Sequence, residues 1–162
     1  MPPRHALPAP KYPAKGGRMP SYSGKIPESV QDLLRALAAP WLSEADLKRA
    51  HLHIGTWLSR MILRVMPDPI PGVDPAAVTL GRHIFMDPAY WLLDRLPGFR
   101  LLVHEMVHVR QWREKGWLGF LLTYIRDYLS HPQRYGGVRL EHEAVEVARA
   151  VEDRWHTEGF PV

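Results

Sequence analysis

The chain has 162 residues, an ordinary length for a single domain, and contains no cysteine. The lack of thiols excludes a disulfide framework, a cysteine-ligated zinc finger, an iron–sulfur cluster and a cysteine nucleophile. A metal site in this chain must therefore use its nine histidines together with aspartate or glutamate.

The net charge of +4 belongs to one end of the sequence. Residues 1–27 contain five basic side chains and no acidic one, whereas residues 28–162 contain 16 basic and 17 acidic side chains. The body is thus nearly neutral, which makes a nucleic-acid-binding function unlikely on charge grounds.

Residues 1–27 also hold seven of the sixteen prolines. This composition predicts a disordered or extended basic tail, and a solubilising role is a simpler expectation than an anionic-surface contact or a propeptide-like arm. Prolines interrupt every apolar run there, and the apolar stretch 117–125 is too short to cross a bilayer. We expect no membrane span, and a cytoplasmic protein or one exported without a recognisable signal peptide.

The remainder, 28–162, is predicted to form a single domain that begins with helices. Apolar residues at helical spacing predict a helix over 28–39, ended by Pro40. Ser43 and Asp46 form a capping pattern for one further turn. A second helix is expected over 57–66, before a proline-rich loop.

Two segments have the pattern of strands. The alternation of residues 51–54 predicts a short strand, and the β-branched and apolar residues of 77–86 predict a second. Gly81 interrupts this second segment and indicates a bulge or a close backbone approach.

Helices dominate the rest of the chain. They are expected over 98–115, 117–129 and 138–155, with Gly116 between the first two. The sequence therefore predicts a helix-rich α+β domain with a small β-sheet.

The helix over 98–115 contains the sequence HEMVH, an HExxH motif. Because residues four apart share one face of a helix, His104 and His108 can offer two imidazole nitrogens to one metal ion. Glu105 then lies beside the ion, where a general base for a metal-bound water is needed. Zinc suits imidazole and carboxylate ligands. The alternative interpretation is a pair of hydrogen-bonded histidines on an amphipathic helix.

A catalytic zinc site requires a third protein ligand. The last helix offers Glu141, which precedes the small Ala144 by three positions and so lies where another helix can approach closely. His142 and His131 are weaker candidates, and Glu143 is expected on the solvated surface. Gln111 shares the face of the two motif histidines, where it can hydrogen-bond a ligand, contact substrate or join two helices.

Three segments resemble one known family. HEMVHVRQW fits the pattern HExxHxxQ, AVTLGRHIF resembles a strand and glycine that precede it, and LEHEA is similar to a downstream LExEA segment. Together they resemble the zincin-like metallopeptidase domain called the extracellular contractile injection system core domain. The resemblance implies a zincin-like fold with a central HExxH helix, a Zn²⁺ site of His104, His108 and Glu141, and Glu105 as the base.

The expected function is that of a zinc metallopeptidase, which hydrolyses a peptide or protein substrate with a zinc-activated water. Candidate oxyanion donors are Tyr124, Tyr128, Tyr135 and His142, among which the sequence does not choose. The alternative is a catalytically silent, zinc-stabilised scaffold, adaptor or cargo domain. Neither the oligomeric state nor the substrate follows from the sequence.

Overall fold

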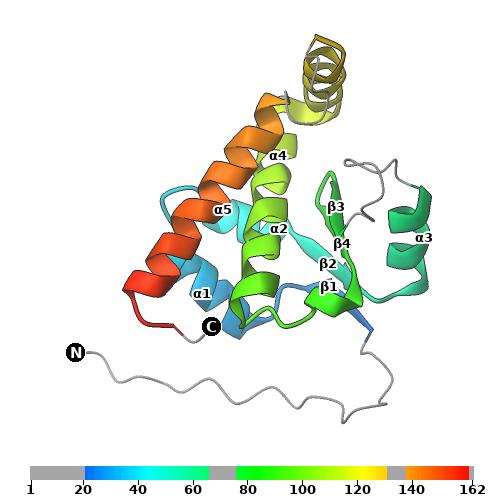
Figure 1. Ribbon diagram of the computed structural model, residues 1–162. Coiled ribbons are helices and arrows are strands. Elements are labelled where there is room, and N and C mark those ends of the chain that lie inside the picture. The colour runs from blue at the N-terminus through cyan, green and yellow to red at the C-terminus, as the bar shows by residue number, and fades with distance from the viewer. Residues whose placement is uncertain (1–20, 66–75, 131–137, 161–162) are drawn as a thin grey trace.

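A computed structural model describes residues 21–65, 76–130 and 138–160. The described chain is rich in helix and contains one small mixed sheet, which confirms the α+β class (Figure 1). Pro67, Pro69 and Pro71 of the expected loop lie outside the described residues. Within the described part, no helix is both long and apolar enough to span a membrane.

The predicted helices of the first half are present. Helix α1 spans Glu28–Ala38 and buries its apolar stripe in the core. Helix α2 spans Glu44–Arg49 and begins with a capping box, in which the Ser43 side chain and the Asp46 side chain each accept from the other residue's backbone N–H. Helix α3 spans Trp57–Val65.

The sheet contains four strands in the order β1-β2-β4-β3. They are β1 (Tyr22–Lys25), β2 (His51–Ile54), β3 (Ala77–Leu80) and β4 (His83–Met86). The pair β2 and β4 is parallel, and the two outer pairs are antiparallel.

Two predictions about strands need correction. The segment 77–86 is a hairpin rather than one strand, because Gly81 adopts a φ of 64° and reverses the chain between β3 and β4. Strand β1 lies inside the predicted tail, so the folded part of the chain begins before residue 28. Residues 1–20 of that tail lie outside the described residues.

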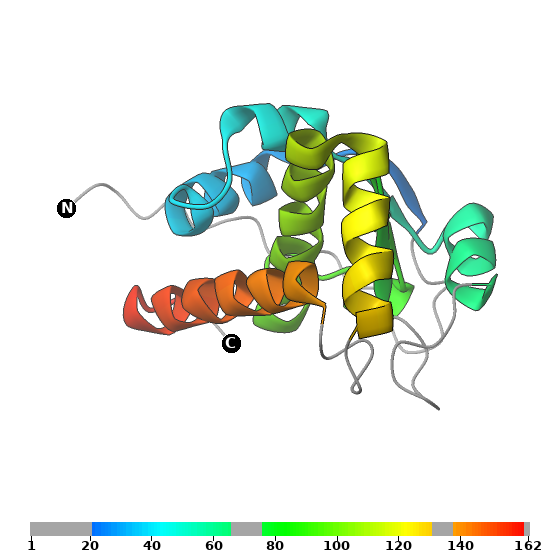
Figure 2. The same ribbon diagram turned by 90° about the horizontal axis from the view of Figure 1, so that it is seen from above.

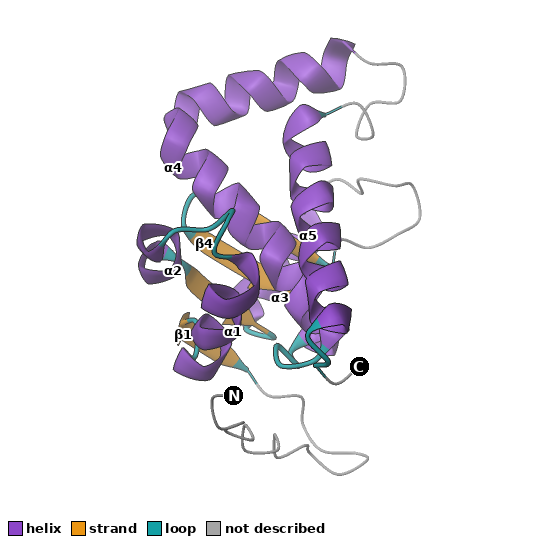
Figure 3. Ribbon diagram, turned by 90° about the vertical axis from the view of Figure 1, so that its left-hand side faces the viewer, coloured by secondary structure: helices purple, strands orange, loops and turns teal. Residues whose placement is uncertain are grey.

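Helix α4 spans Leu96–Ser130 and bends at Gly116, whose φ of 68° and ψ of 173° are not helical. The sequence predicted two helices separated at this glycine, and the bend is evident in Figure 3. Helix α5 spans Arg139–Thr157. A short 3-10 helix, η1, spans Pro88–Tyr90 and precedes α4.

The first arm of α4 lies at the centre of the molecule. Helix α5 packs along one side of it and the sheet along the other, while α3 lies on the far side of the sheet (Figures 1 and 2). Inward-facing sheet residues such as Leu52 and Ile84 join Phe99, Leu102 and Met106 of α4 in one core. The HExxH residues therefore lie on a rigid element between a second helix and a sheet.

Candidate metal centre

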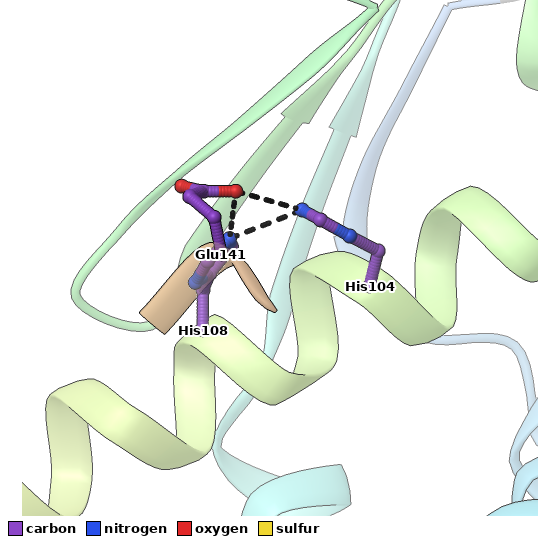
Figure 4. Close-up of side chains that lie close together, drawn as sticks. All are labelled: His104, His108 and Glu141. Atoms are coloured by element: carbon purple, nitrogen blue, oxygen red, sulfur yellow. Dashed lines mark hydrogen bonds and ion pairs between the residues drawn. The ribbon is translucent and has the colours of Figure 1, made fainter. Parts of the chain in front are cut away.

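The two motif histidines lie one turn apart on the first arm of α4. Leu102, Val103 and Met106 face the core and fix the rotation of the helix about its axis. With this face buried, His104 and His108 project together toward the start of α5 (Figure 4). Their Nε2 atoms are 3.2 Å apart, as the sequence predicted for imidazoles at this spacing.

Glu141, in the first turn of α5, completes a group of three. Its Oε2 lies 3.3 Å from Nε2 of His104 and 3.4 Å from Nε2 of His108 (Figure 4). Ala144, one turn further along α5, is fully buried, in line with the expected close helix approach. The structure thus brings together the three side chains that the sequence analysis selected as ligands.

The dimensions of this triangle fit a tetrahedral zinc ion. Zinc bonds to imidazole nitrogen and carboxylate oxygen of about 2.0–2.2 Å require neighbouring ligand atoms about 3.3–3.6 Å apart. The three observed separations of 3.2, 3.3 and 3.4 Å match or lie just below that range. A zinc ion at this position would have three protein ligands and a fourth position for water.

The start of α5 is fixed by Asp127 on the second arm of α4. Its carboxylate accepts from the backbone N–H of Arg139 at 3.3 Å and from the side chain of Arg139 at 3.1 Å. Asp127 is buried, and the hydrogen bond from Arg139 lowers its pKa to about 2 despite the opposing effect of desolvation. Because Arg139 opens the helix whose first turn carries Glu141, this contact helps to place that ligand.

Gln111 connects the centre to α5. Its Oε1 lies 2.8 Å from Nδ1 of His108, and its Nε2 donates to the carbonyl of Leu140 and to the carboxylate of Glu143. Gln111 therefore makes both the ligand contact and the interhelical bond that the sequence left as alternatives. Glu143 was expected on the solvated surface. Its carboxylate also accepts from the side chain of Arg110, and this contact joins α5 to α4.

The surroundings of His108 favour its charged form. Burial lowers the pKa of its imidazole, but the hydrogen bond and the negative charge of Glu141 outweigh that effect and raise the pKa to about 9. Glu105 adds to the negative potential. The negative potential of these carboxylates also suits a divalent cation at this position.

Glu105 faces strand β3 and is 4% exposed. Its Oε2 accepts a 2.6 Å hydrogen bond from the hydroxyl of Thr79, which belongs to β3 and is also buried. The sequence analysis did not identify Thr79, because no local pattern indicates which strand residue faces the motif helix. Its position follows only from the register that places Thr79 opposite Ile84 on the core face of the sheet.

A cavity of about 380 Å³ opens beside the motif. His104 and Glu105 line it together with Ala77 of β3, Tyr90 and Val145 of α5. One candidate ligand, His104, and the expected base, Glu105, therefore border the same open space. A comparable cavity of about 400 Å³, near Lys115 and Arg139, does not include a motif residue.

The structure selects none of the four candidate oxyanion donors. Tyr124 packs against Phe120, and His142 is exposed on α5. The side chain of Tyr128 and the whole of Tyr135 lie outside the described residues, as does the alternative ligand His131.

Comparisons with known proteins give one match. A protein-family model described as the eCIS core domain matches residues 34–116, about half of the chain. The matched segment includes both motif histidines and Glu105, and it ends before Glu141. No curated protein and no solved structure gives a significant match.

Proposed function

Because this chain belongs to the eCIS core domain family and brings two histidines and a glutamate to one point, we propose that it is a zinc-dependent peptidase of the zincin type. Its metal ligands would be His104, His108 and Glu141, and its general base Glu105. The proposal adds a specific chemistry to the membership of the eCIS core domain family.

One observation carries this proposal. The three ligand atoms lie within 4.8 Å of one another, and the carboxylate that follows the first histidine borders the same cavity as that histidine. A pair of histidines that are only hydrogen-bonded in the core would not need a carboxylate from another helix. It would also not need the three atoms to have the spacing of tetrahedral zinc ligands. The donor set of two nitrogens and one oxygen is one that catalytic zinc sites use.

When bound, zinc supplies an activated water and polarises the carbonyl of the scissile bond. Glu105 would serve as the general base and later return the proton to the leaving amine. The hydroxyl of Thr79 orients the Glu105 carboxylate, so that one oxygen is hydrogen-bonded while the group faces the cavity.

The substrate would be an extended polypeptide. Strand β3 is the terminal strand of the described sheet, and Ala77 at its start lines the cavity. A peptide that pairs with this strand would pass in front of Glu105 and the metal centre.

The test uses zinc-loaded protein and a peptide library prepared from a digested proteome, with cleavage read by mass spectrometry. The parent protein should cleave a defined subset of peptides, and Glu105→Gln should retain zinc and lose cleavage by at least 100-fold. The exposed Glu146→Gln serves as a matched control and should behave as the parent does. Equal cleavage by Glu105→Gln and the parent would refute the proposed mechanism.

A second function is favoured by the burial of Glu105. A carboxylate that is 4% exposed and bonded to Thr79 is also suited to a structural role, in which zinc only stabilises an adaptor or cargo domain. In that case zinc would raise the melting temperature, and neither the parent nor the variant would cleave any peptide of the library.

A further inference from the structure

Three histidines gather on the face of the sheet that is turned away from α4. His51 and His53 alternate along β2 with Leu52 and Ile54, which are buried in the core. His83 of β4 is the direct register partner of His51 in the parallel pair. All three therefore project from the same side of two adjacent strands, and each is partly accessible.

The rings are close enough to share a ligand. Their centroids are separated by 5.2 Å for His51 and His53, 5.3 Å for His53 and His83, and 5.5 Å for His51 and His83. Nε2 of His53 is already 3.1 Å from Nδ1 of His83. The third nitrogen would come from His51, whose ring centroid lies 5.2 Å from that of His53 and 5.5 Å from that of His83.

Surrounding residues hold the central ring in place. The hydroxyl of Ser23, on β1, lies 2.9 Å from Nδ1 of His53, so Nε2 is the nitrogen that faces the cluster. Phe85 stacks on the same ring at a centroid distance of 4.8 Å. A hydrogen bond to the far nitrogen of an imidazole is the usual means by which proteins orient a histidine ligand.

The surroundings of two of these rings favour the neutral form. Desolvation lowers the pKa of His53 and of His83, and neighbouring positive charges lower both further. Metal ions bind the neutral imidazole, which these conditions favour. The nearby Lys25 directs its ammonium to the carbonyl of Lys48, and Arg82 makes only a 3.4 Å contact with His83.

We propose that His51, His53 and His83 form a second metal site, which binds a transition-metal ion of the class of Zn²⁺ through three imidazole nitrogens. A neutral set of three histidines is a known zinc donor set, and it is unsuited to Ca²⁺ or Mg²⁺, which require oxygen ligands. This site is independent of the proposed peptidase function, because it shares no residue with the HExxH centre.

The test counts zinc ions bound by the full, metal-stripped chain in competition with a chromogenic chelator. The parent should bind two Zn²⁺ per chain. Each of His83→Gln and His108→Gln should bind one, and the exposed His156→Ala should still bind two. The affinity of the second site should fall at least tenfold in His83→Gln, whereas Mg²⁺ should not compete.

A direct measurement on the parent protein avoids dependence on how the variants fold. Imidazole resonances of His51, His53 and His83 should shift or broaden as the second equivalent of Zn²⁺ is added, and that of His156 should not. Unchanged resonances, or a His83→Gln variant that binds as many ions as the parent, would overturn the second site. If the parent bound one Zn²⁺ per chain and only His108→Gln lost it, zinc would bind at the HExxH centre alone and the second site would be refuted.

Discussion

The side-chain oxygen of Gln111 lies 2.8 Å from Nδ1 of His108. The amide cannot be reversed without loss, because its nitrogen donates to two groups that only accept, the carbonyl of Leu140 and the carboxylate of Glu143. Oε1 must therefore accept, so Nδ1 of His108 carries a proton. When the ring is neutral, its Nε2 holds the lone pair that faces Glu141.

We predict that Gln111→Ala weakens zinc binding at the HExxH centre by about 10- to 100-fold, because the ring of His108 loses its orienting acceptor. The measurement is the zinc affinity in the His83→Gln background, where the sheet cluster does not contribute. Gln31→Ala is the matched control, since Gln31 lies on α1, apart from the site, and donates to the carbonyl of Ile26. An unchanged affinity in Gln111→Ala would show that the contact does not position the ligand.

We predict that Thr79→Val separates activity from metal binding. Valine preserves the shape of threonine but removes the hydroxyl that donates to Glu105. Zinc affinity should stay within twofold of the parent, while cleavage of a library peptide should slow by about 10- to 100-fold, because the base is no longer held in place. Thr79→Ser retains the hydroxyl and should recover most of the rate. Equal rates for Thr79→Val and the parent would contradict the positioning role.

Gly116 provides a prediction about stability. Its φ of 68° and ψ of 173° lie in a region that is essentially restricted to glycine. Gly116→Ala should therefore lower the free energy of unfolding by about 1–3 kcal/mol, as measured by urea denaturation. Gly119→Ala, three residues further in the helical second arm, should instead raise it by about 0.5–1 kcal/mol. Equal changes in the free energy of unfolding for the two substitutions would contradict the non-helical conformation of Gly116.

Asp127 provides a prediction about pH. Its folded-state pKa of about 2 lies below the ordinary value of 3.8, so its charged form stabilises the fold above pH 4. That contribution should disappear as the pH falls from about 4 to 2. The difference in unfolding free energy between the parent and Asp127→Asn should therefore shrink over this interval and remain constant above it. A difference that is independent of pH down to 2 would exclude the ionic contact with Arg139.

Local patterns were sufficient to predict which three side chains meet at the candidate metal centre. The i, i+4 spacing of His104 and His108 determines that they share a helix face, and the position of Glu141 before the small Ala144, together with the resemblance to a known family, selected it among the acidic residues of the last helix. Thr79 could not be predicted in the same way. Its contact with Glu105 depends on strand register and on the packing of β3 against α4, which are long-range properties.

The errors in the fold have similar causes. The β-branched and apolar residues of 77–86 are compatible with one strand or with two, and only the positive φ of Gly81 decides between them. Strand β1 was missed because its four residues carry few apolar side chains and follow a proline-rich segment. Its place in the sheet comes from pairing with β2 rather than from its own propensity.

The most direct test of the metal centre is the anomalous scattering of zinc in crystals of the full chain grown with Zn²⁺. The account predicts a strong peak about 2.0–2.2 Å from Nε2 of His104, Nε2 of His108 and Oε2 of Glu141. Absence of any peak between these three side chains at saturating zinc would contradict it, whatever other sites the ion occupied.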